Sequence, residues 1–259
     1  MIDRIFNRTI FLWASAIAIT LFTVNPGMAL LQRVNNMNEA YINCLKNENC
    51  ADTKAINEAR VYYMILSQLY PDYGRGAEME GVCFLLLKQD RLAIKEFQEA
   101  IKHNPNLFWV SFELGKAFYR EGHYAQALKC FQAILSQDDR TLFRKATLST
   151  LRRLPEKTRE ALMLGLVDFI AKIKLGSYQM AIGCLIHQGN LIQAKSIIDL
   201  GLGNPQFRQN GFFILANRSW WEDDSRKAML VRIDSTAYNK PVLHPWSYFI
   251  QPLKEVLYQ

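Results

Sequence analysis

Residues 108–139 read FWVSFELGKAFYREGHYAQALKCFQAILSQDD, and this stretch decides the fold. Residues 74–107 align with residues 108–141 without a gap, at a spacing of 34. The alignment pairs Gly81 with Gly115, Phe84 with Phe118, Ala93 with Ala127, Ile94 with Leu128 and Phe97 with Phe131. A fixed period of this length predicts a repeat architecture, in which each unit packs on its neighbours.

Small and large residues are distributed within residues 108–139 as a pair of packed helices requires. Gly115 and Ala127 allow two helix backbones to approach closely, and Gly122 is placed to end the first helix. Large apolar residues fill the predicted seam: Leu114, Phe118, Tyr124, Leu128 and Phe131. This pattern resembles the tetratricopeptide repeat family. The resemblance implies an all-α fold, a solenoid of helical hairpins, and a function in binding other proteins.

The phase of the repeat extends beyond the two clear units at residues 74–141. Alanines recur in phase at Ala59, Ala93, Ala127 and Ala161, and after a one-residue slip at Ala194 and Ala228. Gly189-Asn190 precedes Ala194 as a turn between helices would. We therefore expect a degenerate unit in residues 32–73 and degenerate tetratricopeptide-like hairpins in residues 142–234, with five or six units in all.

Prolines mark two further boundaries in the second half of the chain. Pro155 followed by Glu156 predicts the start of a largely buried helix over about residues 156–175. Pro241, Pro245 and Pro252 interrupt any long helix after residue 235. Residues 235–259 are therefore expected to form an extended tail that caps the last unit or contacts a partner.

The N-terminal segment is directed to a membrane. Residues 10–24 read IFLWASAIAITLFTV, carry no charge and follow Arg4 and Arg8. We predict that residues 1–31 form a single transmembrane anchor with a cytoplasmic N-terminus, which places the repeats on the periplasmic or extracytoplasmic side. A cleaved signal peptide is the alternative, because residues 27–29 form a small-x-small site after Pro26.

The five cysteines fall into two groups. Cys83, Cys130 and Cys184 lie in apolar helical patterns and are expected to be small core residues. Cys44 and Cys50 lie in a polar stretch, where a short disulfide between them would fit an oxidising compartment. The chain has no paired cysteine or histidine spacing for zinc or attached haem, so we expect no metal site and no cofactor.

Catalytic and nucleic-acid motifs are missing from the sequence. It contains no phosphate-binding loop, no GxSxG and no HExxH, so we expect a protein that is not an enzyme. Residues 140–160 contain seven basic side chains and two acidic ones. A solvated helix face explains them better than acidic lipid or an acidic partner, and no nucleic-acid module surrounds them. The sequence leaves open the role of two aromatic clusters, Trp220-Trp221 and residues 246–249.

The family resemblance implies a concave groove lined by the first helix of each unit. In this register the groove residues are Arg75, Glu78, Val82, Leu85, Trp109, Phe112, Lys116 and Tyr119. Aromatic side chains suit a peptide with large apolar residues. The alternative is that some of these rings, Phe112 among them, pack against the neighbouring unit. The resulting hypothesis is a membrane-anchored adaptor or accessory subunit that binds a protein partner within a membrane or envelope complex. A secreted periplasmic binding module and an enzyme of glycan or envelope metabolism are the alternatives.

Overall fold

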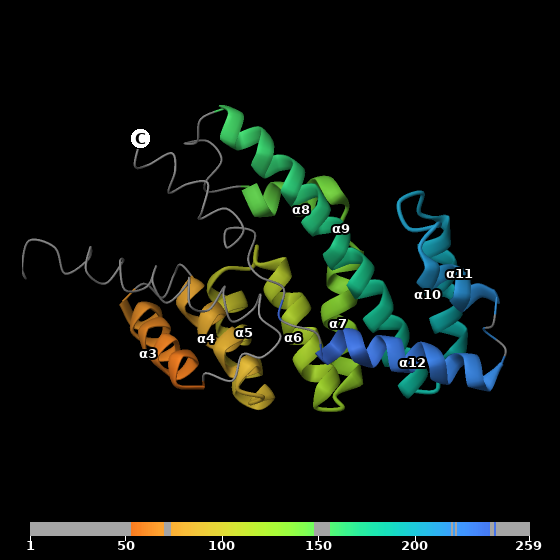
Figure 1. Ribbon diagram of the computed structural model, residues 1–259, viewed down its shortest axis with the longest axis horizontal. Coiled ribbons are helices and arrows are strands. Elements are labelled where there is room, and N and C mark those ends of the chain that lie inside the picture. The colour runs from red at the N-terminus through yellow and green to blue at the C-terminus, as the bar shows by residue number, and fades with distance from the viewer. Residues whose placement is uncertain are drawn as a thin grey trace, which may run out of the picture. The chain divides into compact units, whose positions relative to one another are not determined.

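The computed structural model describes residues 53–69, 74–147, 156–218, 220, 222–238 and 241, in which every regular element is an α-helix (Figure 1). The chain divides into two compact units, Met1–Ala55 and Ile56–Gln259, and nearly all of the described residues belong to the second. The helices are α3 (Thr53–Leu69), α4 (Arg75–Leu86), α5 (Asp90–His103), α6 (Phe108–Arg120), α7 (Tyr124–Leu135), α8 (Asp139–Thr147), α9 (Glu156–His187), α10 (Leu191–Gly203), α11 (Gly211–Arg218) and α12 (Asp223–Tyr238). The all-α prediction is confirmed for the described residues.

One kind of turn joins the helices of three hairpins, α4–α5, α6–α7 and α9–α10. In each turn a residue with positive φ follows the first helix: Lys88, Gly122 and Gly189, at 58°, 77° and 72°. The N–H of that residue bonds a carbonyl three residues back, and the next N–H bonds one five residues back, at 2.8–3.0 Å. These turns lie 34 and 67 residues apart, so both the predicted period and the one-residue slip are present in the backbone.

A glycine on the first helix faces a phenylalanine on the second in the first two hairpins. A Cβ added at Gly81 would lie 2.6 Å from the Phe97 ring, and one at Gly115 would lie 2.6 Å from the Phe131 ring. Neither distance leaves room for a methyl group, so only glycine permits this approach. The predicted pairing of residues at a spacing of 34 is therefore a repeated packing contact.

The alanine phase holds through the third hairpin and then fails. The buried alanines of the phase are Ala59, Ala93, Ala127 and Ala194. Ala228 is exposed, and α12 instead buries Met229, Ile233 and Ala237. The expectation that Ala228 continues the repeat is therefore wrong, because α12 turns a different stripe toward the core. The side chain of Ala161 lies outside the described residues.

The first helix of the third hairpin, α9, is much longer than the first helix of either other hairpin. The predicted start at Glu156 is confirmed, but α9 continues to His187 instead of ending near residue 175. No turn interrupts it, and Gly176 lets it pass close to α6: a Cβ there would lie 2.7 Å from the Phe112 ring. The short helix α8 packs beside α9, and Lys174 contacts Asp139 between them.

Within the described part of the chain, Gly165–His187 of α9 is long and apolar enough to cross a membrane by length and composition alone. Of its most apolar window, 61% is buried inside the protein, as expected for a helix in a packed core. The predicted anchor at residues 1–31 and the predicted Cys44–Cys50 disulfide lie outside the described residues.

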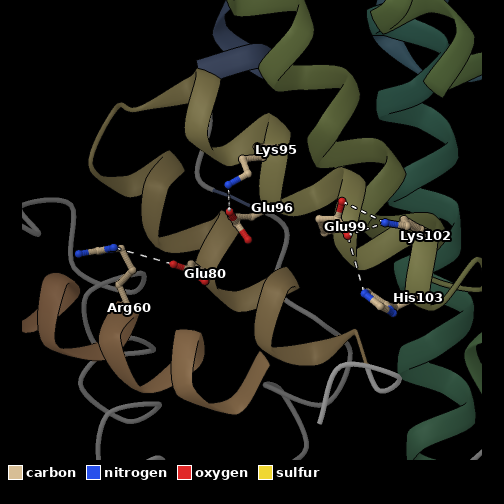
Figure 2. Close-up of polar contacts among 7 residues, drawn as sticks. All are labelled: Arg60, Glu80, Lys95, Glu96, Glu99, Lys102 and His103. Carbon is tan, nitrogen blue, oxygen red and sulfur yellow. Dashed lines mark hydrogen bonds and ion pairs between the residues drawn. The ribbon is translucent and has the colours of Figure 1, made fainter. Parts of the chain in front are cut away.

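α3 packs against α4 beside a small group of charged side chains. A Cβ at Gly76 of α4 would lie 2.4 Å from the backbone nitrogen of Ser67 in α3. Figure 2 shows Arg60 of α3 directed at Glu80 of α4, with 3.8 Å between Nη1 and Oε1. Lys95 and Glu96 of α5 form a second ion pair in the same view. These contacts place the Glu80 carboxylate in the α3–α4 interface, next to Arg60 of α3.

The last helix folds back instead of extending the series of hairpins. α12 contacts α11, as the next element along the chain should, but it also contacts α9 and α6 (Figure 1). α12 reaches Tyr238, so residues 235–238 are helical where an extended tail was predicted. As a result, the C-terminal end of α12 lies over residues of the second and third hairpins.

Candidate functional site

The predicted groove residues share one face of α4 and α6, which we call the inner face. That face is not open to solvent. Glu78, Val82, Trp109, Phe112, Lys116 and Tyr119 are buried, and Leu85 is half-buried. Arg75 lies in α4, and its side chain is outside the described part of the structure. The resemblance implied accessible side chains, and this expectation needs correction because α9 and α12 pack over α6. A role for these residues in partner binding remains a prediction.

The two clear units are joined across this face by a buried hydrogen bond. Trp109 Nε1 donates to Glu78 Oε1 at 2.9 Å. The Trp109 ring lies edge-on to Phe169 of α9, with 6.4 Å between ring centroids. Trp109 therefore links α4, α6 and α9, which makes it a structural residue of the inner face.

Lys116 and Glu113 form a buried ion pair on α6. The Lys116 Nζ lies 3.2 Å from Glu113 Oε2, and both side chains are 2% exposed. The same ammonium group lies 5.6 Å from the centroid of the Phe112 ring. Burial lowers the pKa of Lys116, because desolvation disfavours the charged form. A charge pair of this kind needs both members, since either one alone would be buried without compensation.

Tyr119, at the C-terminal end of α6, is the predicted groove residue with the most polar surroundings. Its hydroxyl donates to Asp234 Oδ1 of α12 at 2.8 Å. His187 Nε2 of α9 lies 3.0 Å from the same oxygen, and its ring stacks on Tyr124 at 4.3 Å. Because the one hydroxyl proton points to Asp234, Nε2–H of His187 is the donor in the second bond. Burial, followed by the bond to Asp234, raises the pKa of Tyr119.

Arg120 connects three helices. Its Nε donates to Asp90 Oδ1 of α5 at 2.9 Å, and its Nη1 donates to the Ala237 carbonyl of α12 at 2.6 Å. A second pair lies alongside, with Arg91 Nε donating to Glu121 Oε2 at 2.8 Å. The Arg120 side chain is 9% exposed, whereas that of Arg91 is 88% exposed. Arg120 therefore holds the end of α12 in a site largely shielded from water.

Gly183 of α9 completes the surface under α12. A Cβ at this position would lie 2.5 Å from Cγ2 of Ile233 and 3.1 Å from the Tyr119 hydroxyl. We call Tyr119, Arg120, Gly183 and His187 the α12 seat. Gly183 leaves space for the Ile233 side chain, and the Tyr119 hydroxyl donates to the Asp234 carboxylate. The Arg120 guanidinium donates to the backbone carbonyl of Ala237.

Three of these four seat residues were missed as site residues by the sequence argument. Arg120, Gly183 and His187 were not among the predicted groove residues. Arg120 follows the predicted groove residue Tyr119 directly, which was a usable signal. Nothing local marks Gly183 or His187, because they meet Tyr119 only after α9 packs beside α6 and α7.

The described residues contain no group of three or more histidine, cysteine, aspartate or glutamate side chains that could hold a metal ion. Cys83 and Cys184 are fully buried, as predicted for core residues, and Cys130 is partly buried. Burial raises the pKa of Cys83 and Cys184 to about 12 and that of Cys130 to about 11. These thiols stay protonated at neutral pH, which makes them poor nucleophiles.

Two other sequence features can be placed. Arg140 and Arg144 of the basic stretch are exposed on α8, in agreement with a solvated helix face. Trp220 is 1% exposed, and its carbonyl accepts a hydrogen bond from Arg226 Nη1 at 2.9 Å. Trp220 is therefore a core residue, and residues 246–249 lie outside the described part.

Comparison with known proteins supports one family. Residues 110–139, which cover most of α6 and all of α7, match a family model described as tetratricopeptide repeat. No curated protein and no solved structure matches the chain.

Proposed function

We propose that this chain, which carries a tetratricopeptide repeat at residues 110–139, is a helical scaffold that binds a partner protein. The observation that carries the proposal is the repetition of one hairpin, with the same turn at Lys88, Gly122 and Gly189. Stacked hairpins of this kind present extended surfaces for other proteins.

The inner face of α4 and α6 is the proposed contact surface. In the free chain most of its side chains are buried, so a partner needs part of that cover to move. Tyr119 is the best probe of this surface, because its hydroxyl is bonded to α12 and not to its own hairpin. We infer that the partner is a subunit of a membrane or envelope complex and that residues 1–31 tether the scaffold to the membrane, with the repeats on the extracytoplasmic side.

The test is capture of the full-length tagged chain from gently solubilised membranes, followed by reconstitution from purified components. One partner should be recovered in fixed stoichiometry and should bind the purified chain. Tyr119→Phe should weaken that binding, whereas Tyr238→Phe should leave it unchanged, because Tyr238 is 70% exposed. A chain that recovers no partner in fixed stoichiometry contradicts the scaffold function.

The tether is tested separately by mass spectrometry of the mature N-terminus. An intact N-terminal segment in the membrane fraction supports the anchor. Loss of residues 1–29 with recovery in the soluble fraction identifies the secreted periplasmic module instead.

A further inference from the structure

α12 is held to the rest of the protein by one narrow stripe. The buried residues of this helix are Met229, Ile233 and Ala237, spaced four apart. Val231 and Tyr238 on the same helix are 69% and 70% exposed. A helix with a single buried stripe contributes much less to the core than α6, which buries eleven residues. α12 is therefore a surface helix that packs on the protein through one buried stripe.

The polar contacts of α12 are specific as well as few. Asp234 accepts a hydrogen bond from Tyr119, and the Ala237 carbonyl accepts one from Arg120. Ala237 is in the last turn of α12, where carbonyl groups lack helical partners and carry the negative end of the helix dipole. The seat therefore recognises the end of a helix, with an aliphatic residue, a carboxylate next to it and a small residue one turn later.

The route of the chain separates this contact from ordinary packing of neighbouring repeats. The Tyr119–Asp234 bond joins residues 115 apart, and the Arg120–Ala237 bond joins residues 117 apart. The contact between α12 and the second hairpin therefore does not depend on a short connection between them, and a helix from another molecule could make the same hydrogen bonds.

We propose that the α12 seat binds an amphipathic helix of the partner with this same pattern, and that α12 is the resident occupant that the partner helix replaces. This inference rests on the proposed scaffold function. It identifies the partner's chemistry: an aliphatic side chain facing Gly183, a carboxylate on Tyr119, and a helix C-terminal carbonyl on Arg120. The C-terminal end of α6 would then be covered by α12 in the free chain and by the partner helix in the complex.

A labelled peptide covering residues 222–238 is the probe, and its binding is measured by fluorescence anisotropy. The host is the full-length chain carrying Ile233→Asp, since a carboxylate cannot be buried against Gly183 and α12 leaves the seat. The matched control is Val231→Asp, which places the same charge on the exposed face of α12. The peptide should bind the Ile233→Asp chain at least about tenfold more tightly than the wild-type or Val231→Asp chains.

The specificity of the seat is tested in the Ile233→Asp host. Adding Tyr119→Phe, or using an Asp234→Asn peptide, should weaken binding by about tenfold, because a hydrogen bond to a charged group is lost. Equal binding to all three hosts, or binding indifferent to Tyr119, would overturn the proposal. A wild-type dimer that the peptide dissociates would identify a second copy of this chain as the occupant and would likewise overturn it.

Amide hydrogen exchange of the wild-type chain keeps the proposal testable if Ile233→Asp fails to fold. α12 amides should exchange through local opening about a hundredfold or more faster than α7 amides. Equal protection of α12 and α7 would show that α12 is not displaceable. If a captured partner binds normally to Tyr119→Phe and the peptide does not bind, the scaffold function stands and only this inference fails.

Discussion

Gly115 shows at the residue scale how a repeat position is fixed by space. Because Gly115 has no side chain, the Phe131 ring fills the space where its Cβ would lie. The neighbouring positions on α6 are buried as well, so the backbone cannot shift to admit a methyl group without disturbing several contacts. This makes Gly115 a structural requirement of the hairpin, independent of any partner.

We expect Gly115→Ala to destabilise the protein by about 1–3 kcal/mol, because the new Cβ would overlap the Phe131 ring. The control is Gly203→Ala at the end of α10, where a Cβ would meet nothing within 4 Å. That variant should be neutral or stabilised by up to about 1 kcal/mol, since alanine favours the helix. Urea unfolding followed by far-UV circular dichroism measures both, and equal stabilities would refute the packing argument.

Glu80 gives a pH-dependent prediction. Burial, reinforced by Glu96, raises its pKa from 4.5 to about 7 in spite of Arg60. An acid with a raised pKa stabilises the fold while protonated, so this stability is fully present below about pH 4.5 and is lost as the pH rises through about 7. The difference in unfolding free energy between Glu80→Gln and wild type should grow by up to about 3 kcal/mol over that range.

The measurement is urea unfolding of both proteins at a series of pH values. Glu58→Gln on the exposed face of α3 serves as the control and should follow the wild-type curve. A Glu80→Gln curve parallel to the wild type throughout this range would mean that Glu80 ionises freely in the folded protein.

Helices meet at the element scale through charged side chains near their ends. Asp90 at the start of α5 pairs with Arg120 at the end of α6, and Arg91 pairs with Glu121 one residue further on. The two pairs connect successive hairpins in the same place, but only Arg120 also reaches α12. The difference in burial between them decides which pair matters for stability.

Arg120→Met should destabilise the protein by about 2–4 kcal/mol, because Asp90 and the Ala237 carbonyl lose a shielded donor. The same variant should increase hydrogen exchange in α12 more than in α7. Arg91→Met removes an exposed ion pair and should cost less than about 1 kcal/mol. Similar losses in the two variants, by urea unfolding, would show that Arg120 acts as an ordinary surface charge.

At the scale of the whole molecule, regular hairpins are followed by a last helix, α12, that does not continue the repeat and packs back on α6 and α9. The first two hairpins could be predicted in detail from Gly81, Gly115 and the residues at a spacing of 34, because each contact joins residues close in sequence. The third hairpin was marked by Gly189 and Ala194. The prediction that Ala228 continues the repeat was wrong, because alanine is as compatible with an exposed helix surface as with a buried seam. Of the four residues of the α12 seat, only Tyr119 was among the predicted groove residues.

The sequence by itself determined the hairpins, their turns and their 34-residue spacing, because the hydrogen bonds and seams involved are local and recur with the period of the helix. Only the tertiary structure decided that α9 continues past its expected end, that the inner face of α6 is covered, and that α12 folds back onto it. Those features depend on contacts such as Tyr119 with Asp234, which join residues 115 apart. No local periodicity encodes a contact of that length, since its partners are chosen by how whole helices fill the remaining space.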